Sequence, residues 1–189
     1  VIPVDIARAD FPVFASRTYL NSGSYGAMCL AVRSAIEDYI QTRMTVGSDW
    51  DHWVEKLEQS RGLLARLVGC GPDEMSVSTS VSESVNSLAS ALEFDGGRDG
   101  VVVTAFDFPT TSQIWLAQAR RGARVTRALA DGRGTAIPLS EFDRLVDDRT
   151  LLVSIPVVCF RNGARLDLEP VIRLCHERGA RVLVDAYQA

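Results

Sequence analysis

Residues 181–189, RVLVDAYQA, decide how the rest of the chain is interpreted. The consecutive apolar residues Val182, Leu183 and Val184 are typical of a fully buried strand in a parallel sheet, because both faces of such a strand are covered. Asp185 follows at the carboxyl end of the strand, where α/β sheets bind their ligands. An unpaired carboxylate there is costly, so Asp185 needs a cationic or hydrogen-bonding partner. The residues alone leave a second interpretation equally open, in which Asp185 is the N-cap of a following helix.

Strand-sized and helix-sized segments alternate along the chain. This alternation predicts an α/β fold of three layers, with a mostly parallel sheet covered by helices. The predicted strands are 75–78, 101–104, 124–126, 150–156 and the segment from 181. A further short strand is predicted to start at residue 18 and to run into a turn. The predicted helices are 30–44, 51–68, 80–92, 111–121, 140–146 and 167–178, preceded by an extended or short helical lead-in over 1–17.

Composition narrows the function classes. The chain has 189 residues, 47% hydrophobic and 23% charged, which is enough to form a core. A net charge of -4 gives no basic surface for nucleic acid, and the apolar runs are too short to span a membrane. Four cysteines without a CxxC pair and two histidines without ligand spacing disfavour a metal site and fit a cytoplasmic protein. The absence of GxGxxG and GxxxxGK[ST] disfavours nicotinamide enzymes and P-loop ATPases.

Residues 76–92 indicate an anion site. A short strand leads through a serine-rich loop into a helix, so exposed backbone amides and the positive end of the helix dipole face the same way. Phosphate is the ligand that such an arrangement most often binds. The same residues also fit an ordinary capping box with Ser80 or Ser82 as N-cap, and the physics alone favours that simpler interpretation.

An aromatic loop, AFDFPTTSQIW at residues 105–115, follows the strand 101–104. Phe106 and Phe108 therefore stand at the ligand-bearing edge of the predicted sheet. An aromatic side chain there can stack on a planar ring, which contributes about 0.5–1.5 kcal/mol beyond its burial. The alternative is that Phe108 belongs to the core.

The segment VDAYQA resembles part of the aminotransferase class V superfamily of fold-type I pyridoxal-phosphate enzymes, which includes cysteine desulfurases and kynureninase. The resemblance runs from about Tyr19 to the end of the chain and implies pyridoxal 5'-phosphate as the cofactor. It also implies that Asp185 lies against the pyridine nitrogen and Gln188 near the phenolic oxygen. A carboxylate at that nitrogen keeps the ring protonated and makes it a better electron sink.

Two further segments carry the resemblance. TSVSESVN, residues 79–86, is similar to the family's phosphate cradle, which implies phosphate contacts from the Ser82 hydroxyl and the Val81 amide. Ser80 stands in a glycine position of that cradle, and Val81 replaces a small residue. The run FPT from Phe108 resembles a kynureninase-like motif that places the phenylalanine over the pyridine ring. Phe108 and Val157 stand where desulfurases carry histidine, which disfavours a desulfurase.

The segment YLNSGSYG, residues 19–26, is similar to the family's N-terminal signature, a loop on the substrate side of the cofactor. This similarity implies that Asn21, Ser22 and Ser24 are candidates for substrate contact. As chemistry alone, the segment is a turn rich in small polar residues.

The family also implies a lysine that binds the cofactor covalently, downstream of the Asp-x-x-Gln strand. The single lysine of this chain, Lys56, lies far upstream, beside two glutamates on a predicted helix where local pairing explains it. The chain begins at Val1 without an initiator methionine and stops at Ala189, so we expect a complementary lysine-bearing half on the same polypeptide or on a second chain. The predicted division is an N-terminal segment with the first helix over 1–50, and part of the cofactor-binding large domain over 51–189.

Two function classes follow. The first is part of a pyridoxal-phosphate enzyme that acts on an amino acid or a similar small molecule, as an aminotransferase or a carbon-sulfur or carbon-carbon lyase. The resemblance implies a symmetric dimer for this class, and the apolar strand at 181–185 invites pairing with further sheet. The second class is a lysine-free remnant of the fold that serves as a binding or assembly module.

Overall fold

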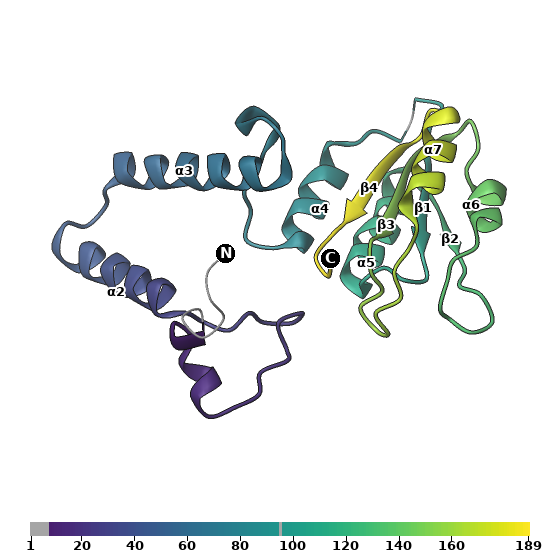
Figure 1. Cartoon of the computed structure of the whole chain (residues 1–189). Coiled ribbons are helices and arrows are strands. Elements are labelled where there is room, and N and C mark those ends of the chain that lie inside the picture. Colours follow the sequence, from purple (N-terminus) through teal and green to yellow (C-terminus); the bar gives the residue numbers. More distant parts are fainter. Residues whose placement is uncertain (1–7, 95) are drawn as a thin grey trace. The chain divides into compact units, whose positions relative to one another are not determined.

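The computed structural model describes residues 8–94 and 96–189, which fall into two compact units, Val1–Val77 and Ser78–Ala189 (Figure 1). Each unit is described by itself. The predicted lead-in over 1–17 lies partly outside the described residues. The functional division predicted near residue 50 stays a prediction.

The first unit consists of helices and loops, namely η1 (Pro12–Ala15), α2 (Leu30–Thr45), α3 (Trp50–Val68) and η2 (Pro72–Glu74). The helices predicted over 30–44 and 51–68 are therefore confirmed. Asp49 caps the start of α3, where its side chain accepts a hydrogen bond from the amide of His52 at 3.2 Å. Gly69 ends the same helix with φ +78°, a conformation that glycine adopts without steric cost. Lys56 is exposed and donates to Gln59, as a solvated helix residue should.

The two short strands predicted in this part of the sequence are wrong. Residues 18–20 and 75–78 form no strand within the described ranges. A strand needs a neighbouring edge to satisfy its amides and carbonyls, and no described segment pairs with either run. The turn predicted after residue 18 is present, since the amides of Ser24 and Tyr25 both donate to the carbonyl of Asn21 at 3.0 Å.

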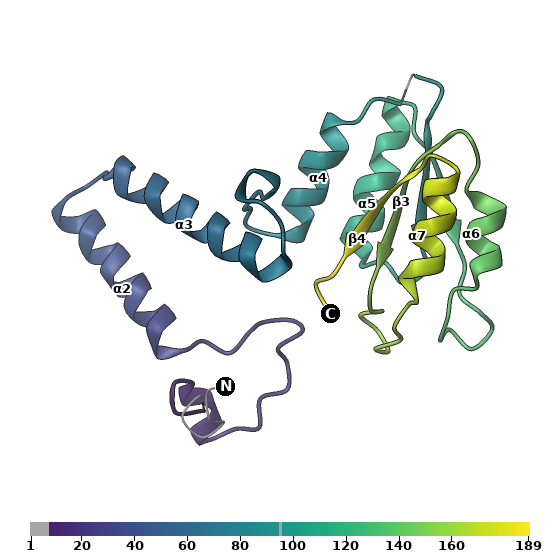
Figure 2. The same ribbon diagram turned by 45° about the horizontal axis from the view of Figure 1, so that its top comes forward.

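The second unit is an α/β sandwich with the strand order β2-β1-β3-β4, all parallel (Figures 1 and 2). Its strands are β1 (Gly100–Thr104), β2 (Arg124–Ala128), β3 (Thr150–Pro156) and β4 (Arg181–Asp185). Its helices are α4 (Val81–Ala91), α5 (Pro109–Ala117), η3 (Gln118–Arg121), α6 (Leu139–Leu145) and α7 (Leu168–Glu177). These elements confirm the alternation expected from the sequence, within one or two residues at most boundaries.

Helices cover both faces of the sheet (Figure 2). On one face, α4 and α5 bury Val85, Ala89 and Trp115 against the odd-numbered β1 residues Val101 and Val103. On the other face, α6 and α7 pack a separate cluster that includes Phe106, Phe142, Ile155, Val171 and Cys175. The alternation of side chains along each strand therefore divides the core into two layers.

The expectation that the segment 182–184 is fully buried is wrong. Val182 and Leu183 are half-buried, and Val184 is 38% exposed. The reason is that β4 lies at an edge of the described sheet, hydrogen-bonded on one side to β3 in the register Ser154 to Leu183. An apolar run specifies a strand but does not reveal whether both of its edges are paired.

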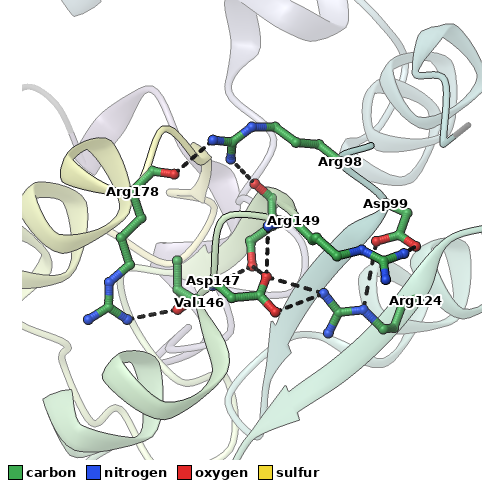
Figure 3. A network of polar contacts seen from close by, with 8 residues as sticks. Arg98, Asp99, Arg124, Val146, Asp147, Arg149 and Arg178 are labelled. Atoms are coloured by element: carbon green, nitrogen blue, oxygen red, sulfur yellow. Dashed lines mark hydrogen bonds and ion pairs between the residues drawn. The ribbon is translucent and has the colours of Figure 1, made fainter. Parts of the chain in front are cut away.

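Arginine side chains connect the amino ends of the strands (Figure 3). Arg98 donates to the backbone carbonyl of Thr150 at 2.7 Å and to that of Arg178 at 3.0 Å. Asp99 forms ion pairs with Arg124 and Arg149. This network lies at the end of the sheet opposite to the carboxyl ends of the strands.

Candidate functional site

The N-terminus of α4 has the capping geometry that the serine-rich sequence predicts. Ser80 is the N-cap, and its hydroxyl oxygen accepts a hydrogen bond from the amide of Glu83 at 3.1 Å. The Glu83 carboxylate accepts in return from the amide of Thr79 at 2.8 Å, and the hydrogen bonds from Thr79 lower the pKa of Glu83. The Ser80 hydroxyl is thus already used in stabilising the helix start.

Ser82 lies in the first turn of α4 and connects this helix to α5. Its hydroxyl donates to Oγ1 of Thr110 at 3.1 Å, across 28 residues of sequence. The backbone amides of Val81 and Ser82 have no acceptor among the described residues, as is usual for the first turn of a helix. The structure thereby brings two helix N-termini together, each with its positive dipole end and exposed donors.

The aromatic loop places its two phenylalanines differently. Phe106 is fully buried in the core, whereas Phe108, the residue before α5, is 47% exposed. The alternative that Phe108 is a core residue is therefore wrong. Its ring contacts that of Phe160 edge to face, with centroids 5.0 Å apart and an interplanar angle of 70°. Phe108 is therefore half-exposed just after β1, at the carboxyl edge of the sheet.

Asp185 ends β4 at the same edge. Its Oδ1 accepts a hydrogen bond from the amide of Tyr187 at 3.0 Å, the two-residue separation of an Asx turn. Its backbone carbonyl accepts from the amide of Val157 at 2.9 Å, which fixes the end of β4 to the segment after β3. The half-buried side chain lies on the α4 and α5 side of the sheet, since Leu183, two residues before it, packs in that layer. Gln188 is exposed in the turn that follows.

Asp107 is a functional candidate that sequence reasoning missed. Its side chain is 6% exposed, and its Oδ2 accepts from the amide of Thr104 at 2.7 Å. Oδ1 is buried without a hydrogen-bond partner among residues 8–94 and 96–189. Burial is the main cause that raises the pKa of Asp107 to about 7; the hydrogen bonds from Thr104 act against it, and the charges of Asp185 and Arg127 make smaller, opposing contributions. The sequence did offer a signal for this residue, because Asp107 stands between two phenylalanines shortly after a buried strand.

A cavity of about 320 Å³ opens beside Asp107. It is bounded by α5, β2 and the loop after β3, with Ser112, Arg127, Phe160 and Arg161 among its lining residues. Arg161 donates to the backbone carbonyl of Ala105 at 2.7 Å, so the loop after β3 is held against the aromatic loop.

The remaining candidates belong to the first unit, which is described by itself. Asn21, Ser22 and Ser24 form an exposed turn in the other unit, and their role as substrate contacts stays a prediction. Within the part of the chain that the structure describes, no group of histidine, cysteine and acidic side chains could hold a metal ion. No helix in that part is both long and apolar enough to cross a membrane.

Known proteins with similar sequences cover almost the whole of this chain. The curated relatives include the "Uncharacterized aminotransferase YcbU" of Bacillus subtilis, 33% identical over 96% of this chain and 48% of that protein. A "Probable cysteine desulfurase" of Methanothermobacter thermautotrophicus is 29% identical over 96% of this chain and 46% of that protein. The chain therefore spans about half the length of the curated relatives it matches.

Solved structures share the fold. A mutant of C-DES with glycine covalently linked to its PLP cofactor superimposes with a TM-score of 0.83, at 22% identity, over 96% of this chain and 50% of that one. Likeness at this identity shows the fold alone. It identifies the sandwich as part of a fold-type I domain. The sequence profile of the family described as Aminotransferase class-V matches residues 19–189, and this chain belongs to that family.

Proposed function

We propose that this chain forms the phosphate-binding and ring-binding part of a pyridoxal-phosphate-dependent enzyme that acts on an amino acid or a similar small molecule. The observation that carries the proposal is the hydrogen bond from Ser82 to Thr110. It joins the two segments that sequence reasoning assigned separately to the phosphate and to the pyridine ring. The relatives and the solved structure named above support the same cofactor class.

The phosphate would be held at the start of α4. The amides of Val81 and Ser82 point outward from the helix without an acceptor in the described residues, and the Ser82 hydroxyl can donate to an anion in place of Thr110. The helix dipole adds to the attraction for negative charge. The Ser80 hydroxyl already accepts from Glu83, so Ser80 contributes chiefly by fixing the helix start.

The ring would lie between the aromatic loop and the end of β4. The half-exposed ring of Phe108 offers a stacking surface, and Asp185 offers a carboxylate at the same edge of the sheet. Gln188 follows in the adjoining turn, within reach of the same edge along the chain. When bound, the cofactor supplies an electron sink that stabilises negative charge at the substrate carbon. Asp185 enhances that property by holding a proton on the ring nitrogen.

For the reaction we propose a broad class. Relatives named as cysteine desulfurases and an aminotransferase support an amino-acid substrate, with transamination or cleavage of a carbon-sulfur or carbon-carbon bond. Phe108 stands where the sequence comparison placed a kynureninase-like aromatic residue, and that assignment stays a prediction. The turn with Asn21, Ser22 and Ser24 is proposed to contact the substrate.

We further propose that the covalent lysine comes from a complementary half, since the matched relatives are about twice as long. The only lysine here, Lys56, is exposed and paired with Gln59. The complete unit is proposed to assemble as a symmetric dimer, with β4 extended by further sheet.

The test is cofactor uptake by the chain together with its lysine-bearing half. The protein, freed of cofactor by dialysis, is titrated with pyridoxal phosphate, and uptake is followed by visible absorption and by intact mass after borohydride reduction. We expect one cofactor per chain and a mass increase confined to the lysine-bearing half. A colourless protein that takes up no cofactor would support the lysine-free binding module instead.

A further inference from the structure

The cavity of about 320 Å³ beside α5 is lined by none of the residues proposed above to contact the cofactor. Its apolar wall is formed by Val103, Leu116, Val125 and Phe160. Val103 and Val125 belong to the core layer that α4 and α5 cover, so the cavity opens on that face of the sheet. A volume of about 320 Å³ lies at the lower end of the range for small-molecule sites, about 300–1,000 Å³.

Two guanidinium groups line this cavity from different elements. Arg127 is on β2, and its exposed side chain forms no hydrogen bond or ion pair with the residues that the structure describes. Arg161, in the loop after β3, donates from Nη2 to the carbonyl of Ala105 at 2.7 Å, and its Cζ lies 5.8 Å from the centre of the Phe160 ring. These contacts hold Arg161 in place while its other N–H groups stay available to a ligand.

Asp107 lines the same cavity and is almost completely buried. Its Oδ2 accepts from the amide of Thr104 at 2.7 Å, whereas Oδ1 has no hydrogen-bond partner within residues 8–94 and 96–189. A buried oxygen without a partner is costly, which points to a partner supplied from outside the chain. Burial is the main cause that raises the pKa of Asp107 to about 7, so below that pH the acid holds a proton and offers a donor instead of a repelling charge.

These groups together suit an anion with an apolar body. Guanidinium groups present N–H donors in a planar, rigid arrangement that matches the geometry of a carboxylate. The hydroxyl of Ser112 on α5 adds a further donor to the lining. The aliphatic side chains of the wall can bury a short hydrocarbon chain, which an inorganic anion does not have.

We propose that this cavity is a binding site for a small aliphatic carboxylate, whose charged group is bound by Arg127 and Arg161 and whose hydrocarbon part contacts Leu116 and Val125. The inference goes beyond the proposed function, because it uses none of the proposed cofactor contacts and requires no reaction. Arg161 joins the site to the aromatic loop through its hydrogen bond to Ala105.

Calorimetric titration of the complete protein with 3-methylbutanoate at pH 6 tests the site. The probe has no amino group, so it cannot form a Schiff base with an aldehyde cofactor. We expect saturable binding, and a dissociation constant about tenfold higher in Arg127→Gln and in Arg161→Gln, because each variant loses a charged hydrogen-bond donor. The uncharged probe 3-methylbutanamide has nearly the same shape and should bind about tenfold more weakly than the carboxylate for the same reason.

Arg133→Gln is the matched control, since Arg133 is exposed in the turn after β2 and does not line the cavity. Arg127→Gln leaves the hydrogen bond between Arg161 and Ala105 intact, so it decides the test if Arg161→Gln disturbs the loop. The site is overturned by a lack of saturable binding, by equal affinity in Arg127→Gln and Arg133→Gln, or by equal affinity for the amide probe.

Cofactor uptake is measured separately on the same preparations. Binding of the carboxylate probe as expected, in a protein that takes up no pyridoxal phosphate, would support this site and reject the proposed function. Cofactor uptake without saturable binding of the probe would reject this site and leave the proposed function standing.

Discussion

The hydroxyl of Ser82 in the first turn of α4 donates to Oγ1 of Thr110 in the first turn of α5, at 3.1 Å. Two helices that begin 28 residues apart are therefore held with their N-termini adjacent. An anion placed there meets donors and dipoles from both helices at once. The first prediction tests this pairing.

Replacing Ser82 with alanine should weaken cofactor binding about tenfold to a hundredfold, since a hydrogen bond to a charged group contributes about 1.5–3 kcal/mol. The dissociation constant is measured by spectroscopic titration of the cofactor-free complete protein. Ser87→Ala is the matched control, because Ser87 lies exposed on the same helix. Equal affinity in the two variants would remove Ser82 from the phosphate site.

Phe108→Ala should mainly weaken cofactor binding, whereas Phe106→Ala should mainly lower the stability of the fold. The exposed ring of Phe108 contributes stacking, so its loss should weaken cofactor affinity by about twofold to tenfold with little change in unfolding. Phe106 is fully buried, and its truncation should cost about 3–5 kcal/mol of stability. Affinity titration and denaturant unfolding are compared on both variants. A large loss of stability in Phe108→Ala would show that Phe108 acts as a core residue.

Asp185→Asn should lower turnover by orders of magnitude while the protein stays folded. The amide is nearly isosteric with the carboxylate but cannot hold the ring proton. Steady-state kinetics and far-ultraviolet circular dichroism are measured on the same preparation. Unchanged turnover would exclude Asp185 from the chemistry.

The buried acid predicts a pH dependence of stability. The folded-state pKa of Asp107, about 7, lies above the reference value of 3.8, so the folded state binds the proton more tightly than the unfolded state does. Stability should fall as pH rises from about 4 to about 7. Asp107→Asn removes this dependence, so wild type should lose about 2.5 kcal/mol relative to the variant between pH 5 and pH 8. Unfolding curves at both pH values check the sign, and a parallel loss in both proteins would contradict it.

Arg121 should stabilise the end of α4. Its guanidinium donates to three backbone carbonyls at the helix terminus, those of Ala89, Ser90 and Leu92. Arg121→Ala leaves these acceptors without that donor and should cost about 1–2 kcal/mol. Arg120→Ala, an exposed neighbour in η3, should stay within about 0.5 kcal/mol of wild type. Equal denaturation midpoints for the two variants would show that the carbonyls are satisfied by water.

Apolar periodicity was sufficient to predict most elements of the second unit, because each strand and helix there buries a defined face. The segment 150–156 coincides with β3 for this reason. Periodicity could not show that β4 lies at an edge of the described sheet, since that depends on which segment pairs with it. Short polar runs such as 75–78 gave too little pattern to separate a strand from an extended loop.

A candidate residue could be found from the sequence where its residue type has one recognisable chemical role. Ser82, Phe108 and Asp185 all lie at helix starts or strand ends of one sheet edge. Asp107 escaped prediction because the burial of a side chain depends on how distant segments pack, which a local sequence pattern does not show. The sequence predicted a capping box but left Ser80 and Ser82 both open as its N-cap, and the structure assigns that role to Ser80.

The network at the amino ends of the strands is built entirely from guanidinium cations, with no ammonium group among them (Figure 3). A guanidinium stays protonated and does not condense with an aldehyde at neutral pH, whereas a lysine amine does. Lys56 is the one side-chain amine in all 189 residues. Within these 189 residues, therefore, the cations that hold the amino ends of the strands together add no amine that could compete for the proposed aldehyde cofactor.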